Sequence, residues 1–167
     1  VKAASNSQYL FMNLKNLKEI DHLDYLDTSD VTSMNGMFSG CSSLESLDLS
    51  NFKTPNLTNM GGMFYYCKSL TTLDVSSFDT SKVTTMLGLF RDDSSLTKLD
   101  LSNFDTSTVT MMSSMFMNCS NLSDLNIASF DTAKAVAFMN AMFSGTLPFK
   151  IALGSKFKFG ININLPD

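Results

Sequence analysis

The sequence has one histidine, three cysteines and no tryptophan in its 167 residues. A single imidazole, at His22, leaves no Cys-His or Ser-His-Asp set to assemble, and the polar residues recur along the chain instead of converging. The cysteines do not occur in the C-x₂-C pairs of zinc sites, and they are odd in number, which argues against a disulfide framework. We therefore expect no enzyme activity, no metal site and no cofactor, and we interpret His22 as a residue of an insertion loop or of the surface.

Positive charge is also scarce in this chain. Lys and Arg number 12 against 16 Asp and Glu, which gives a net charge of −4. Nucleic acids and anionic membranes require clustered Lys and Arg, so we expect neither as a partner. No run of about 18 apolar residues is present, so no membrane insertion is expected. The start of the chain lacks a signal-peptide pattern, which is compatible with a cytosolic protein or with a mature or excised fragment.

What the sequence has in abundance is repetition, together with 12 Met and 14 Phe. The words FDTS or FDTA begin at Phe78, Phe104 and Phe130, which are separated by a constant interval of 26 residues. Leu26 and Phe52 open two equivalent segments earlier in the chain at the same interval. A strict period of this length indicates a solenoid, in which each unit buries its apolar face against its neighbours.

Each unit changes its apolar period partway along. Val83, Met86 and Leu89 recur at three-residue steps, and Phe90 follows, which predicts a short helix. Residues 96–101 then alternate apolar and polar side chains, which predicts a strand. Because every unit runs in the same direction, the strands should form one parallel sheet. The predicted fold class is α/β, a solenoid with a parallel sheet on one face and short helices on the other.

Several repeated residues have structural interpretations. A threonine precedes each predicted helix and should cap it by accepting a hydrogen bond from a backbone N–H group. Phenylalanines and methionines at fixed positions should form columns in the core. The cysteines share one position, which suggests a niche for a small buried thiol; a bridge between neighbouring units is conceivable but not required. The predicted caps are Thr28, Thr54, Thr80, Thr106 and Thr132. The predicted aromatic column consists of Phe52, Phe78, Phe104 and Phe130. The niche holds Cys41, Cys67 and Cys119, and Asp93 occupies the equivalent place in one unit.

The repeat also predicts the domain organisation. Residues 1–9 are interpreted as a flexible leader and residues 10–147 as the solenoid. The register breaks near Leu147, and the alternating apolar residues that follow predict a C-terminal β cap of short strands over residues 148–167. The units of the solenoid are expected at about residues 10–26, 27–51, 52–77, 78–103, 104–129 and 130–147.

The outward-facing sheet positions form the predicted binding face. Carboxylates on adjacent strands, about 4.8 Å apart, repel one another, so either nearby serines and loop amides satisfy them or a ligand does, directly or through calcium. Tyr65 and Tyr66 lie outside the core pattern and suit stacking on a sugar, anchoring an interface or simple packing in a turn. The candidate ligand-binding residues are Glu45, Asp48, Thr72, Asp74, Lys98, Asp100, Asp124 and Asn126 on the sheet face, with Tyr65 and Tyr66 as an aromatic pair.

The repeated unit can be written F-D-T-S-x-V-T-x-M-x-x-M-F-x-x-C-x-x-L-x-x-L-D-L-S, and residues 26–50 and 104–128 match it closely. This pattern resembles the BspA-like class of leucine-rich repeats found in bacterial surface proteins. The resemblance covers residues 10–167 and departs from the pattern at residues 53–55, 91–93 and 126. It implies a leucine-rich-repeat fold and a secreted or wall-attached protein engaged in adhesion, and the class supplies no catalytic residues.

We therefore expect a non-catalytic bacterial binding module that is extracellular, attached to the cell surface and part of a larger protein. Its partner would be a host or bacterial surface protein or glycan, bound through the sheet face. The alternative is a structural spacer that holds another domain away from the cell wall. The ligand and the oligomeric state are left open.

Overall fold

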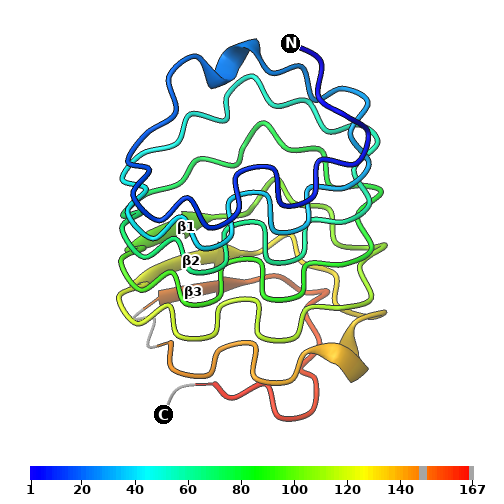
Figure 1. Ribbon diagram of the computed structural model, residues 1–167. Helices are drawn as coiled ribbons and strands as arrows, with labels where there is room; N and C mark the ends of the chain where they lie inside the picture. Colours follow the sequence, from blue (N-terminus) through cyan, green and yellow to red (C-terminus); the bar gives the residue numbers. More distant parts are fainter. Residues whose placement is uncertain (147–149, 166–167) are drawn as a thin grey trace.

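The computed structural model describes residues 1–146 and 150–165, and the chain in it winds through successive coils that stack along one axis (Figure 1). The colours in Figure 1 pass in order from one end of the stack to the other, so each coil lies beside the coils that precede and follow it in the sequence. This arrangement is the solenoid that the 26-residue period predicts.

A parallel sheet occupies one side of the stack. Its strands are β1 (Lys98–Asp100), β2 (Asp124–Ile127) and β3 (Lys150–Leu153), in the order β1-β2-β3. Leu99 pairs with Leu125, which in turn pairs with Ile151, so the register advances by one repeat at each strand. Leu99 and Leu125 point into the core, as the alternation of apolar and polar residues predicts.

The predicted helices are wrong, because the side opposite the strands consists of linked turns. The Met37 N–H donates to the Met34 carbonyl at 3.1 Å within one coil, whereas the Met34 and Gly36 N–H groups donate to the carbonyls of Asn59 and Gly61 in the next coil, both at 2.9 Å. Backbone N–H groups that alternate between their own turn and the neighbouring coil cannot form the i→i−4 ladder of an α-helix. Within the described residues, helical structure is confined to two 3₁₀ turns, η1 (Leu23–Tyr25) and η2 (Val136–Phe138).

The threonines predicted as helix caps instead connect neighbouring coils. The Thr54 hydroxyl donates to the Asp79 carbonyl at 3.0 Å and accepts from the Asp79 N–H at 2.8 Å. The same pair of bonds, between a threonine hydroxyl and the backbone of one residue in the next coil, is made by Thr28, Thr106 and Thr132. Each hydroxyl thus replaces a missing backbone partner at a buried corner, which satisfies two polar groups at once.

The core is a continuous set of apolar columns that runs through the stack. The aromatic column predicted at Phe52, Phe78, Phe104 and Phe130 is buried, with the Phe52 and Phe78 rings tilted by 38°. A second column, not singled out from the sequence, is stacked almost face to face, with ring centroids 5.4–5.9 Å apart and planes within 3–7°. Its members are Phe11, Phe38, Phe64, Phe90, Phe116 and Phe143.

The N-terminal segment, expected as a leader outside the stack, is its first coil. The Ala3 N–H donates to the Asp27 carbonyl at 2.9 Å, and the Tyr9 N–H donates to the Asn35 carbonyl at 3.0 Å. These bonds follow the same coil-to-coil pattern as those in the middle of the chain. Residues 1–9 therefore belong to the solenoid.

The C-terminal segment continues the coil instead of forming a separate cap. β3 is the one predicted cap strand that forms among residues 150–165, whereas residues 157–163 hold turns and irregular structure. The Lys158 N–H donates to the Thr132 hydroxyl, and the Phe143 N–H donates to the Ile163 carbonyl, which extends the corner and turn patterns by one coil. Leu147, Phe149 and the parts of the predicted cap at residues 148–149 and 166–167 lie outside the described residues.

In the part of the chain that the structure describes, neither 3₁₀ turn is long or apolar enough to cross a bilayer, and no other helix is found.

Candidate functional site

The aspartates of the sheet face are held by the turn that follows each strand. Asp48 and Asp74 each accept a hydrogen bond through Oδ1 from the backbone N–H of Ser50 and Ser76, at 2.9 Å. Asp100 makes the same bond with Ser102 at 3.0 Å. These backbone donors, followed by the serine hydroxyls, lower the pKa of all three carboxyls. The serines that the sequence offered as structural partners are therefore the ones used.

Asn126 occupies the next place in this column and behaves in the same way. Its Oδ1 accepts from the Ala128 N–H at 3.2 Å. The turn thus requires an acceptor oxygen and not a charge. Three consecutive coils nevertheless carry an exposed carboxylate at this place.

Four of the predicted sheet-face residues line a single hollow of about 430 Å³. It lies across two neighbouring coils, which contribute Thr72 and Asp74 from one and Lys98 and Asp100 from the other. Its remaining lining consists of Leu73, Ser76, Ser102 and Asn103. The hollow combines two carboxylates, one exposed ammonium group, and hydroxyl and amide groups, which suits a polar partner.

The other predicted sheet-face residues lie outside this hollow. Glu45 forms an exposed ion pair with Lys18 at 2.9 Å. Asp124 lies between two lysines, 4.0 Å from Lys98 Nζ and 3.6 Å from Lys150 Nζ. Within residues 1–146 and 150–165, no three His, Cys, Asp or Glu side chains come close enough together to hold a metal ion.

The two tyrosines of the prediction lie on the turn side and not on the sheet face. Their ring centroids are 6.0 Å apart, and both side chains are exposed. Tyr65 borders two hollows, of about 260 and 310 Å³, and Tyr66 lines the second of them. Tyr9 and Arg91, which line the first, were not predicted. The predicted site residues therefore divide between two separate surfaces.

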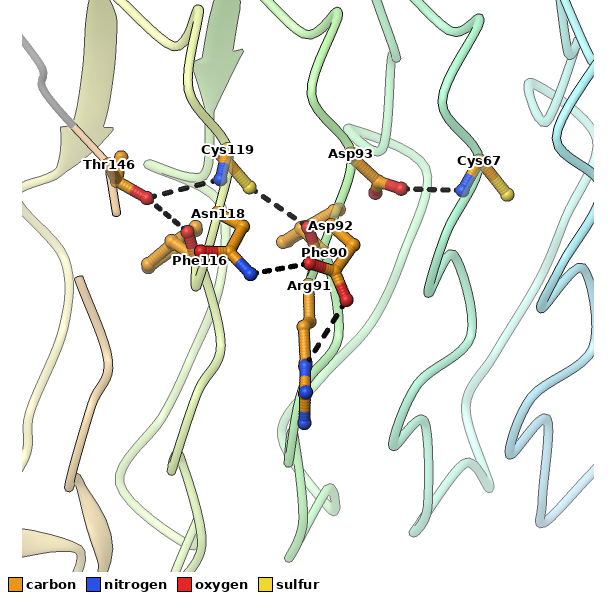
Figure 2. Close-up of polar contacts among 9 residues, drawn as sticks. All are labelled: Cys67, Phe90, Arg91, Asp92, Asp93, Phe116, Asn118, Cys119 and Thr146. Atoms are coloured by element: carbon orange, nitrogen blue, oxygen red, sulfur yellow. Dashed lines mark hydrogen bonds and ion pairs between the residues drawn. The ribbon is translucent and has the colours of Figure 1, made fainter. Parts of the chain in front are cut away.

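The repeated cysteine position is a column of buried polar groups (Figure 2). The Cys119 thiol donates to the Phe90 carbonyl at 2.9 Å, and the Cys67 thiol donates to the Phe38 carbonyl at 3.2 Å. All three cysteines are unbridged. Burial is the largest cause that raises the pKa of the Cys67 and Cys119 thiols. These thiols are therefore protonated and unreactive at neutral pH.

Asp93 replaces cysteine in this column and is fully buried. Its Oδ1 accepts from the Cys67 N–H at 2.7 Å, while Oδ2 has no hydrogen-bond partner (Figure 2). Burial raises the pKa of the Asp93 carboxyl well above its ordinary value, which favours its neutral form. Thr146 occupies the same place two coils later, where its hydroxyl accepts from the Cys119 N–H at 3.2 Å and donates to the Phe116 carbonyl.

Comparisons with known proteins place the chain among repeat proteins. The crystal structure of the T. pallidum leucine-rich repeat protein TpLRR superposes on it with a TM-score of 0.51 at 20% sequence identity, covering 100% of this chain and 72% of that chain. At this identity the likeness shows a leucine-rich-repeat-like fold and nothing more. A search of the curated proteins found no match. A scan of protein families matches residues 1–74 and 71–159 to the family described as "Mycoplasma protein of unknown function, DUF285". The chain therefore belongs to the DUF285 family, here in a solenoid of the leucine-rich-repeat kind.

Proposed function

We propose that this chain is a non-catalytic binding module of the BspA-like class, and that it acts at the outer surface of a bacterial cell as part of an adhesive protein. Its partner is a protein or glycan on a host cell or on a neighbouring bacterium. The sheet face makes the contact, and the hollow at Asp74, Lys98 and Asp100 is its centre. The repeated motif supports the BspA-like class, and the polar sheet face supports a binding function.

The hollow on the sheet face is the observation that carries this proposal. It draws Thr72, Asp74, Lys98 and Asp100 from two coils into one concave surface. Each aspartate uses Oδ1 for its own turn and is exposed, so the carboxylates can accept further hydrogen bonds from a partner. A repeated polar face with a hollow that crosses two coils suits an extended partner better than a small substrate.

The electrostatics support binding over catalysis. Acid–base chemistry with two carboxyl groups needs one pKa raised and the other left low. The carboxyls of Asp48, Asp74 and Asp100 all have a lowered pKa from the same cause, which is the backbone N–H group two residues on. They are equivalent acceptors in a row and offer no acid to pair with a base.

A pair of matched triple variants tests the proposal. In the first, Asp48, Asp74 and Asp100 are all changed to Asn, which removes three charges but keeps the acceptor that each turn needs, as Asn126 demonstrates. In the second, Asp27, Asp79 and Asp105 are changed to Asn. These three carboxylates serve equivalent turns outside the hollow, with Oδ1 accepting from the N–H of the residue two positions on.

Binding of the purified chain to host cells and to bacterial cells is then measured. We expect the first triple variant to bind at least about tenfold more weakly and the second to bind like the parent, because only the first changes the hollow. If the parent binds no cell type, or if both variants bind as the parent does, the sheet face is not an adhesive surface and the spacer function takes its place. Protease treatment of intact cells that express the full-length protein tests the location, since a surface module is cleaved and an internal one is protected.

A further inference from the structure

The turn side carries an exposed aromatic surface that is separate from the sheet-face hollow. Three of the chain's 4 tyrosines, Tyr9, Tyr65 and Tyr66, lie there around two hollows that share Tyr65 and Ser39. Their side chains are 51%, 36% and 39% exposed. The apolar core elsewhere is filled by Phe, Met and Leu. Tyrosine is therefore concentrated at a surface where packing does not require it.

Two of these tyrosines stand at backbone positions that disfavour large side chains. Tyr9 has φ 59° and Tyr66 has φ 64°, both in the left-handed region. The place of Tyr9 is taken in the next three coils by Gly36, Gly62 and Gly88 and then by the small residues Ser114 and Ala141, and the coil before Tyr66 has Gly40 at φ 75°. The left-handed conformation costs a non-glycine residue about 1–2 kcal/mol. The turn imposes this conformation in every coil, and only these two coils keep a large aromatic ring there, which is the observation that favours a role for the rings.

The neighbouring glycine makes room for one of these rings. A Cβ atom added at Gly36 would lie 2.6 Å from the Tyr9 ring, so the ring lies against bare backbone. The Asn35 amide donates to the Tyr9 hydroxyl at 2.7 Å and fixes the ring in place. One face of Tyr9 is thus supported, and more than half of the side chain remains open to solvent. This is the geometry of a stacking platform.

Cations surround the tyrosines in a chain that is acidic overall. Lys68 Nζ lies 4.1 Å from the centroid of the Tyr66 ring, and the Arg91 guanidinium carbon lies 5.5 Å from that of Tyr65. Lys15 lines the second hollow. Figure 2 shows the Arg91 guanidinium directed away from the buried Asp93 and Cys119.

Carboxylates contribute little to this surface. Of the described residues that line the two hollows, none is an aspartate or a glutamate. Asp92, next to Arg91, is engaged by the Arg91 Nε at 3.3 Å and by the Asn118 amide at 2.6 Å. The surface therefore offers net positive charge together with aromatic rings.

We propose that this surface binds an acidic glycan, a saccharide whose rings stack on Tyr9, Tyr65 and Tyr66 and whose carboxylates are bound by Arg91 and Lys15. The apolar face of a sugar ring suits an exposed tyrosine, and the amides and hydroxyls of Asn13, Asn35 and Ser39 match its hydroxyl groups. Arginine binds a carboxylate through two parallel N–H donors. The site is independent of the sheet-face function, since the two surfaces share no residue.

The test is a titration of the full chain with saccharides that differ only in charge. The probes are oligosaccharides of alternating glucuronic acid and N-acetylglucosamine, 3′-sialyllactose, and the carboxyl-reduced form of each. We expect at least one acidic saccharide to bind and its reduced form to bind at least about tenfold more weakly. Failure of both acidic saccharides to bind, or equal binding of the reduced forms, overturns the proposal.

Two variants assign the binding to this surface. Tyr66→Gly removes a ring and relieves the left-handed strain, so the variant should be at least as stable as the parent and still lose binding about tenfold. Arg91→Gln should lose the preference for the acidic over the reduced saccharide. The Asp48, Asp74 and Asp100 to Asn variant should bind the saccharide like the parent. If that variant alone loses binding, the saccharide is a sheet-face ligand and the proposed site is wrong.

Discussion

Replacing Asp93 with cysteine should stabilise the protein at neutral pH. Asp93 is fully buried, and its Oδ2 has no hydrogen-bond partner. Three other coils carry Cys41, Cys67 or Cys119 at this place, and their fit establishes that a thiol is accommodated there. The Cys67 N–H group does not depend on Asp93 either, because it also donates to the Phe64 carbonyl at 3.1 Å. The substitution therefore removes a buried carboxyl group without leaving a donor unsatisfied.

The magnitude follows from the unpaired oxygen of Asp93. A buried polar atom without a hydrogen-bond partner costs about 1–3 kcal/mol. Burial also raises the pKa of the folded carboxyl well above its ordinary value of 3.8, so stability is lost as pH rises above that value. We expect Asp93→Cys to raise the free energy of unfolding by about 1–3 kcal/mol at pH 7.

The pH dependence distinguishes this cause from better packing. For a carboxyl with a raised folded pKa, stability is lost as pH rises from the unfolded pKa toward the folded one. Urea unfolding of the parent and the variant should therefore give a smaller difference in stability at pH 4 than at pH 7. Asp93→Thr, which copies the bonds of Thr146, should behave like Asp93→Cys. A variant that is no more stable than the parent at pH 7, or a gain that is equal at both pH values, would refute the reasoning.

Three further predictions follow from the fold. Phe64→Ala should lower the free energy of unfolding by about 3–5 kcal/mol in urea, because the ring is buried between two stacked rings. Phe138→Ala is the control and should cost less than about 1 kcal/mol, because Phe138 is 54% exposed. Equal losses would contradict the stacked core. Thr54→Val should cost about 1–3 kcal/mol in the same assay, because it leaves the Asp79 backbone groups unsatisfied, and Thr54→Ser should restore most of the loss. The thermal midpoint of unfolding should fall as pH drops from 4 to 2. Carboxyls such as Asp48 have a lowered pKa in the folded protein, so their contribution to stability is lost as they become protonated in that range. An unchanged midpoint would contradict the hydrogen bonds between these carboxylates and the backbone.

The period and the core could be predicted from the sequence because both depend on a fixed interval. Residues such as Phe52 and Phe78 recur every 26 positions, and only stacked coils bury every copy of such a series. The strand register follows from the same interval, since β1 and β2 pair residues one repeat apart. These features need no knowledge of where any individual hydrogen bond goes.

The helices were predicted wrongly because turns can imitate their period. Successive turns place Val31, Met34 and Met37 three residues apart, and Phe38 follows directly, which resembles the face of a helix. What separates the two structures is the partner of each backbone N–H group. The Met34 N–H finds its acceptor at Asn59 in the next coil, and local sequence does not encode that choice.

The candidate site could be predicted only in part. The aspartate column and its serine partners follow from the repeat, because each bond joins residues two positions apart, such as Asp48 and Ser50. The tyrosine surface depends on contacts between coils, which place Tyr9 in one hollow with residues of the next three coils. Because residues 1–9 were interpreted as a leader, Tyr9 was not considered. The sequence signal for its left-handed backbone is the glycine that recurs at the same place in the next coils, beginning with Gly36.

The central claim is that each coil is held only by its two neighbours. Deletion of one complete coil tests this claim most directly. Removing residues 78–103 takes out one period and brings equivalent corners together at Phe104 and Ser77. We predict a folded, cooperatively unfolding protein with an unchanged shape of the far-ultraviolet circular dichroism spectrum, whereas removing residues 78–90, half a period, should abolish folding. If the full-period deletion unfolds like the half-period deletion, the stacked-coil account is contradicted.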